Sequence, residues 1–265
     1  MSEKYWEQPF KWNEAAKKAG KPAKVFCASM ADVFEDNPQV IEWRHRLFDL
    51  IVATPYLTWQ LLTKRAENIM PFVPPSWQDQ FPENVWMGGS AENQKRLEEQ
   101  VKYLVHVPAV VRYLSLEPLL GPLTLPVDCN DGSGFFDWVI VGGESGTHAR
   151  PMHPDWVRSL RDQCHDMGTS FFFKQWGEWY TDKIRIDTGE PSFAMWRSYE
   201  HFTQKLWAKK GDVCVDMAGD TCNIGQDFMH AEYPVAIMQR IGKGKSGHML
   251  DGKEYREFPS VNHQP

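Results

Sequence analysis

Short runs of β-branched and aromatic residues recur along the first two thirds of the chain, and this repetition most constrains the fold. Each run is nearly continuous in apolar character, which is typical of a parallel strand covered on both faces. Helical patterns separate the runs, the clearest being Pro38 to Ala53, Ser90 to Val105 and His153 to Met167. Strands that recur at a spacing of roughly 25–35 residues, with a helix between them, predict βαβ units and an α/β fold. The runs are 24–29, 58–63, 85–90, 112–117, 138–143 and 170–174.

The residues that follow these runs are polar, and this decides between two α/β architectures. In a (β/α) barrel all strand ends converge on one mouth, where active sites lie. An open doubly wound sheet uses only the ends near its switch point. The pattern therefore favours a (β/α) barrel, TIM-like or partial. The polar strand-end residues are Ser29, Asp32, Thr63, Lys64, Arg65, Ser90, Glu92, Asn93, Ser115, Glu117, Gly142, Gly143, Glu144, Ser145, Lys174 and Gln175.

The strand and helix alternation stops after Gly177. We therefore expect a barrel-type domain over 1–177 and a small β-rich appendage, packed on the barrel, over 178–265. Turn residues at 218–220 and 250–253 each predict a hairpin. The first hairpin carries Cys214 and Cys222, with His230 beyond. Zinc ligands are usually closer together than this pair, so we favour a plain hairpin, with a zinc site as the less favoured alternative.

Composition and net charge limit the cellular compartment and the kinds of binding partner that we expect. No apolar run approaches the ~20 residues that cross a bilayer, and no export signal opens the sequence. The five cysteines are scattered, which predicts free thiols in a reducing compartment such as the cytoplasm. The net charge of −6 argues against a broad electrostatic grip on nucleic acid and leaves a local basic groove open.

Glu117, Glu144 and Lys174 are the candidate catalytic residues. Glu144 lies in a glycine-rich turn where a carboxylate can accept hydrogen bonds from an amine or hydroxyls; the alternative is a solvated turn residue. Glu117 sits in an apolar run and is expected to pair with a strand-end cation. The alternative for Glu117 is an ion pair that merely closes the barrel mouth.

Four cations are candidate anion-binding groups, namely Lys64, Arg65, Lys174 and Arg150. Together they could hold a carboxylate or a phosphate. Taken singly, each is more commonly a surface cation that extends into solvent. Asp32 has a similar alternative, as a helix cap.

Six ordered segments resemble a phage-associated family of unknown function that carries a three-cysteine motif and is distantly similar to radical S-adenosylmethionine enzymes such as spore photoproduct lyase. They are FCASMADVFED, WQLLTKRAENI, VWMGGSAENQ, RYLSLEPLLGPL, WVIVGGESGTHARPM and FFFKQWGEW. The resemblance implies a partial or complete radical-SAM-like barrel whose site residues are the strand-end residues above. For the full-length family it also implies S-adenosylmethionine and a [4Fe–4S] cluster as cofactors. For this chain it implies the cytoplasm of a bacterium or a phage-infected host.

One departure from that family concerns the clustered cysteines near its N-terminus, which are the natural cluster ligands. The present chain enters the family pattern at about Trp6, and its first cysteine is Cys27. We therefore expect it to lack the first strand unit and the iron–sulfur site, and to be inactive in radical chemistry as written. Three explanations stay open: a misassigned start, a split or truncated gene whose missing unit a partner chain supplies, and a genuine short binding module.

The functional expectation is that the strand ends bind a small polar or phosphorylated ligand, such as S-adenosylmethionine or a nucleotide. A nucleic-acid-associated binding or repair module is the alternative, because the many Trp and Tyr residues allow base stacking. A structural phage protein is a third interpretation with less support.

Overall fold

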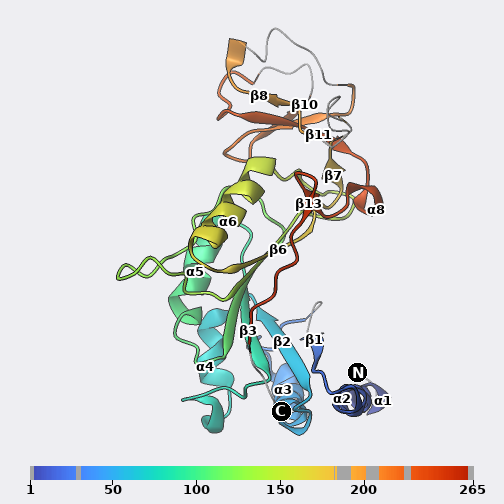
Figure 1. The fold of residues 1–265 in the computed structure, drawn as a ribbon, viewed down its shortest axis with the longest axis vertical. Coiled ribbons are helices and arrows are strands. Elements are labelled where there is room, and N and C mark those ends of the chain that lie inside the picture. The colour runs from blue at the N-terminus through green and yellow to red at the C-terminus, as the bar shows by residue number, and fades with distance from the viewer. Residues whose placement is uncertain are drawn as a thin grey trace.

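Six parallel strands form the central sheet, in the order of the chain (Figure 1). The computed structural model describes residues 3–27, 31–181, 183, 192–200, 209–223 and 228–261. Because β1 and β6 are the two edge strands, the sheet is a curled half-barrel rather than a closed barrel. The α/β class and the six strands are as predicted. The strands are β1 (Ala23–Cys27), β2 (Leu57–Thr63), β3 (Val85–Ser90), β4 (Val111–Leu116), β5 (Trp138–Gly142) and β6 (Ser170–Gln175).

Helices precede or connect most of these strands, and local caps fix where they begin. Asn37 accepts a hydrogen bond from the Gln39 amide at 3.0 Å, with Pro38 in the first turn. The helix predicted from Ser90 begins only at Gln94, because Ser90 pairs within β3 and Asn93 is the cap. The helices and 3-10 turns of this part are α1 (Glu3–Trp6), α2 (Gln8–Ala19), α3 (Pro38–Ala53), η1 (Ala66–Asn68), α4 (Ile69–Phe72), η2 (Pro75–Trp77), α5 (Gln94–Leu104) and α6 (Pro154–Asp166). Among the described helices, none has the length and apolar character to span a bilayer.

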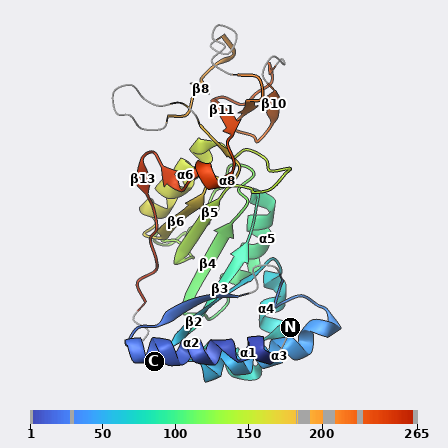
Figure 2. The same cartoon turned by 90° about the vertical axis from the view of Figure 1, so that its right-hand side faces the viewer.

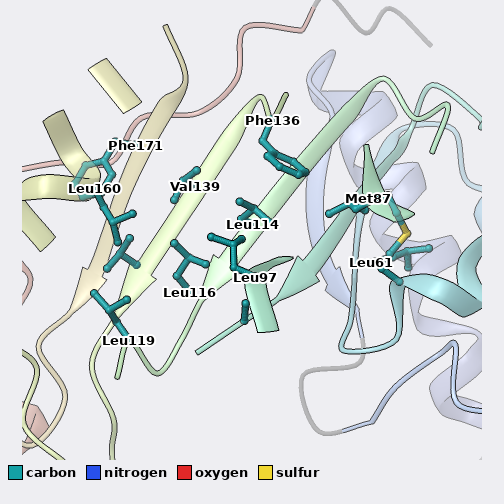
Figure 3. Close-up of a cluster of buried hydrophobic side chains, with 14 of the residues drawn as sticks. Leu61, Met87, Leu97, Leu114, Leu116, Leu119, Phe136, Val139, Leu160 and Phe171 are labelled. Carbon is teal, nitrogen blue, oxygen red and sulfur yellow. The ribbon is translucent and has the colours of Figure 1, made fainter. Parts of the chain in front are cut away.

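The main core lies between the sheet and its helices (Figure 3). Alternate residues of neighbouring strands point to this face, as the two-residue period of a strand requires. The strand side chains meet Leu97 of α5 and Leu160 of α6, both at most 1% exposed. The strand residues shown there include Leu61, Met87, Leu114, Leu116, Val139 and Phe171.

The concave face of the half-barrel is filled with aromatic side chains around Trp86, Tyr113 and Trp138. Tyr113 reaches across β3 and donates its hydroxyl hydrogen bond to the Leu61 carbonyl at 2.9 Å. Gly88 makes room for this ring, since a Cβ there would lie 2.2 Å from a ring carbon. Packed rings therefore occupy the concave face below the carboxyl ends of the strands.

A five-stranded antiparallel sheet and a small hairpin follow the half-barrel (Figure 2). Both predicted hairpins are present, as β9 pairs with β10 and β12 pairs with β13. The elements are β7 (Trp179–Tyr180), β8 (Met195–Trp196), β9 (Val213–Val215), β10 (Thr221–Asn223), β11 (Val235–Arg240), α8 (Lys243–Ser246), β12 (Met249–Leu250) and β13 (Lys253–Glu254).

The C-terminal tail, residues 255–261, leaves this appendage and returns to the half-barrel (Figure 1). The Phe173 amide donates to the Tyr255 carbonyl at 2.9 Å, and the Glu257 amide donates to the Phe171 carbonyl at 3.2 Å. The Phe258 ring then packs on Trp138, with ring centres 5.0 Å apart. The tail thus covers the free edge of β6 and reaches onto the concave face.

Candidate functional site

Four of the predicted residues come together where β3, β4 and β6 end. Ser90 and Ser115 are register partners on β3 and β4, and both are buried. The Ser115 hydroxyl donates to Glu117 Oε1 at 3.1 Å, and Lys174 Nζ lies 2.8 Å from Glu117 Oε2. We call this group, Ser90, Ser115, Glu117 and Lys174, the mouth cluster.

Gly142 at the end of β5 shapes the mouth cluster. A Cβ at this position would lie 2.8 Å from Glu117 Oε2, so a larger residue would collide with the carboxylate. The Glu117 side chain is 17% exposed and that of Lys174 is 52% exposed. The carboxylate is therefore mostly sheltered, while its cationic partner still reaches solvent.

The mouth cluster keeps hydrogen-bonding capacity for a ligand. A carboxylate has about four acceptor positions and an ammonium has three donors. Among the described residues, each Glu117 oxygen makes one contact, and Lys174 uses one donor on Glu117. The cluster can thus accept from an amine or hydroxyl and donate to an anion at the same time.

Glu144 and Arg150 form an ion pair with each other and do not join the mouth cluster. Arg150 donates to both carboxylate oxygens from Nε and Nη2, each at 2.8 Å, and its backbone amide adds a third bond at 2.8 Å. The fork of Arg150 lowers the pKa of Glu144, and the carboxylate raises the pKa of Arg150. Gly143 serves chain packing here, because a Cβ would lie 2.0 Å from the Trp176 carbonyl oxygen.

Asp32 organises a second network at the end of β2. Its Oδ1 accepts from the Thr63 hydroxyl at 2.7 Å, and its Oδ2 accepts from Arg65 Nη1 at 2.8 Å and the Lys64 amide at 3.1 Å. Arg65 is thereby held by Asp32. The Lys64 ammonium has no hydrogen-bond or ion-pair partner in the described part of the chain.

The remaining predicted site residues have mainly local roles. Asn93 accepts from the Arg96 amide at 3.0 Å as the cap of α5, and its side-chain nitrogen lies 3.4 Å from Glu92 Oε1. Gln175 donates to the Ser145 hydroxyl at 3.3 Å. Ser29 lies outside the described residues.

Sequence reasoning missed a pocket of about 480 Å³ beside Lys174. The alternation of glycine and lysine in residues 242–247 was the signal that could have revealed it. Besides Lys174, the pocket is lined by Gln175, Lys243, Gly244, Gly247 and His248.

A buried amide on the concave face was also missed. Gln60 of β2 is 6% exposed, and its Nε2 has no hydrogen-bond partner among the residues that the structure describes. Its register neighbours are Phe26 on β1 and Trp86 on β3. Nothing in the sequence distinguishes this glutamine from a satisfied one.

The cysteines do not fit an iron–sulfur cluster, which needs closely spaced thiolates. Within the described ranges, no three His, Cys, Asp or Glu side chains are grouped to hold a metal. Cys214 faces Cys222 across a hairpin, whereas Cys27 lies in β1 and Cys164 in α6. Burial raises the pKa of the Cys27 and Cys164 thiols to about 12, which keeps both protonated at neutral pH.

Fold and site together define an α/β half-barrel protein with a polar mouth and a β-rich C-terminal part. The chain belongs to the DUF5131 family, described as a protein of unknown function, whose model matches residues 1–259. No curated protein and no solved structure matches the chain.

Proposed function

We propose that the mouth cluster binds a small ligand that carries both hydrogen-bond donors and an anionic group. One observation carries the proposal: the sheltered carboxylate of Glu117 is held 2.8 Å from Lys174 and still has free acceptor positions. The carboxyl ends of the parallel strands are where barrel-type folds bind their ligands. A purely structural ion pair would not need the solvent-reaching ammonium of Lys174.

S-adenosylmethionine and nucleotides both meet this chemical requirement. An ammonium or ribose hydroxyl would donate to Glu117, while a carboxylate or phosphate would accept from Lys174 and from Lys64, whose ammonium has no partner among the described residues. Glu144 and Arg150 are left out of this assignment because their mutual fork occupies both groups.

The half-barrel and the six ordered motifs also support a finer proposal, that the chain is the ligand-binding part of a radical-S-adenosylmethionine-like protein of phage or prophage type. An iron–sulfur cluster would supply the radical chemistry of such a protein. Since the described residues do not fit that cluster, we assign them binding and positioning roles only.

Isothermal titration calorimetry with S-adenosylmethionine and with ATP tests the binding proposal. A charged hydrogen bond contributes about 1.5–3 kcal/mol, so Glu117→Gln is expected to weaken binding about tenfold or more. Glu98→Gln, on the exposed face of α5, is the matched control and should bind like wild type. If neither ligand binds the wild-type protein, or if both variants bind equally well, the mouth cluster is not the binding site.

A second candidate function, binding of single-stranded nucleic acid, is favoured by the surface of α2. Phe10 and Trp12 are 46% and 38% exposed there, on the same helix as the exposed Lys11, Lys17 and Lys18. Exposed rings and lysines together suit base stacking and phosphate contact. Fluorescence anisotropy with labelled oligothymidine at low salt tests this function, and an unchanged signal removes it.

A further inference from the structure

The pocket beside Lys174 lies between the end of β6 and the glycine–lysine loop, which we define as residues 242–247. Its volume is about 480 Å³. The loop follows β11 and contains the short helix α8 (Figure 2). Because Lys174 also belongs to the mouth cluster, the pocket adjoins the proposed ligand site.

The loop is held in place by bonds to the chain just after β6. The Ser246 hydroxyl, on a residue 2% exposed, donates to the Gly177 carbonyl at 2.6 Å. The Trp176 amide donates to the Gly247 carbonyl at 3.2 Å, and the Gly242 amide donates to the Glu178 carbonyl at 3.1 Å. These three anchors order the loop before any ligand binds, which lowers the entropic cost of binding.

The pocket is basic, although the chain carries a net charge of −6. None of its six lining residues is acidic. Lys174 is paired with Glu117, and His248 Nε2 lies 3.0 Å from Glu254 Oε1. The Lys243 ammonium, by contrast, has no hydrogen-bond or ion-pair partner among the described residues. Its charge is available to an incoming anion.

The glycines leave the loop backbone open to a ligand. A Cβ at Gly244 would meet no atom within 4 Å, and the same holds for Gly247. Glycine-rich loops let phosphate oxygens approach the backbone closely, and a lysine adds a point charge.

We propose that the glycine–lysine loop and Lys174 form a binding site for the phosphoryl group of a phosphorylated small molecule. This inference rests on the proposed function, since it makes the phosphoryl group the anionic end of the ligand whose donors reach Glu117. It favours a nucleotide over S-adenosylmethionine, which has no phosphate. Free pyrophosphate presents the same chemistry and should occupy the pocket alone.

Calorimetric titrations with pyrophosphate, ATP and adenosine test the inference on the full chain. We expect pyrophosphate and ATP to bind, and Lys243→Ala to weaken both about tenfold or more, through loss of a charged contact. Gly244→Leu should also weaken both, because its side chain would fill open space at the pocket. Lys21→Ala, which removes an exposed lysine just before β1 at the amino end of the sheet, is the control.

Thermal unfolding of each variant without ligand separates lost binding from lost folding. The inference is wrong if the wild-type protein binds neither pyrophosphate nor ATP. It is also wrong if Lys243→Ala and Gly244→Leu fold and bind these two ligands as tightly as the control does. Glu117→Gln distinguishes the two proposals. If Glu117→Gln weakens ATP while the loop variants do not, only the phosphoryl site fails. If Lys243→Ala weakens pyrophosphate binding but Glu117→Gln leaves ATP binding unchanged, only the mouth-cluster proposal is wrong.

Discussion

His153 joins the half-barrel to the appendage and should make the stability of the protein depend on pH. Its ring is fully buried at the N-terminus of α6. Nδ1 accepts from the Asp155 amide at 3.1 Å, and Nε2 lies 3.0 Å from the Pro234 carbonyl oxygen. These partners assign the single proton of a neutral ring to Nε2. A second proton on Nδ1 would face the Asp155 N–H and break the cap.

Burial lowers the pKa of His153 from 6.5 to about 4. The nearby carboxylates of Asp155 and Asp216 raise it and Arg158 lowers it, but burial dominates. The unfolded chain therefore takes up a proton at a higher pH than the folded chain does. The stability that comes from a neutral His153 is fully present above pH 6.5 and is lost as the pH falls toward 4. At about 1.4 kcal/mol per pH unit, the loss reaches about 2.5 kcal/mol by pH 4.5.

Urea unfolding at several pH values between 7.5 and 4.5, on wild type and His153→Asn, measures this loss. Asparagine is also a good cap and does not titrate in this range, so carboxylates elsewhere affect both proteins equally. Between pH 7.5 and pH 4.5, we expect wild type to lose about 2.5 kcal/mol more of its free energy of unfolding than His153→Asn does. Parallel pH profiles would refute the assignment of a buried, neutral His153.

Three further changes test the packing and the ion pairs. Gln60→Met removes an unsatisfied buried amide and should raise the free energy of unfolding by about 1 kcal/mol in urea titration; a fall would mean that the amide has a partner. Gly88→Ala should lower it by about 1–3 kcal/mol, because the new methyl overlaps the Tyr113 ring. A double-mutant cycle with Tyr113→Leu checks that cause, since the two effects should not add. Glu144→Gln should change stability by less than about 1 kcal/mol in thermal unfolding, as expected of an ion pair at the surface, in which the Arg150 side chain is 58% exposed.

Much of the fold could be predicted because the signals are local. The run 85–90 coincides with β3, and Asn37 and Pro38 mark the start of α3 as their capping chemistry requires. The extent of barrel closure could not be predicted, since it depends on whether the edge strands meet and not on any strand's own residues. α2 was missed because its buried face is small, with only Pro9, Asn13 and Ala16 buried.

The candidate site was predictable in position but not in pairing. Convergence of the strand ends follows from parallel strands, and it correctly brings Glu117 beside Lys174. The pairing of Glu144 with Arg150 does not follow, because both residues lie in the loop between β5 and α6, whose path the strand pattern does not define. The glycine–lysine loop lies in a different part of the chain from Lys174, and only the tertiary fold joins them.

Because the tail returns to β6, the appendage is an insertion in the half-barrel and not a free C-terminal extension. Because Tyr255 and Glu257 bond to Phe173 and Phe171, the residues between β6 and the tail form an excursion whose two ends lie side by side. Excursions with adjacent ends can be exchanged or shortened without rethreading the host domain. The half-barrel could thus keep its edge and its core while the excursion varies. Since that excursion supplies the glycine–lysine loop, ligand preference in this architecture could change by replacing one insert.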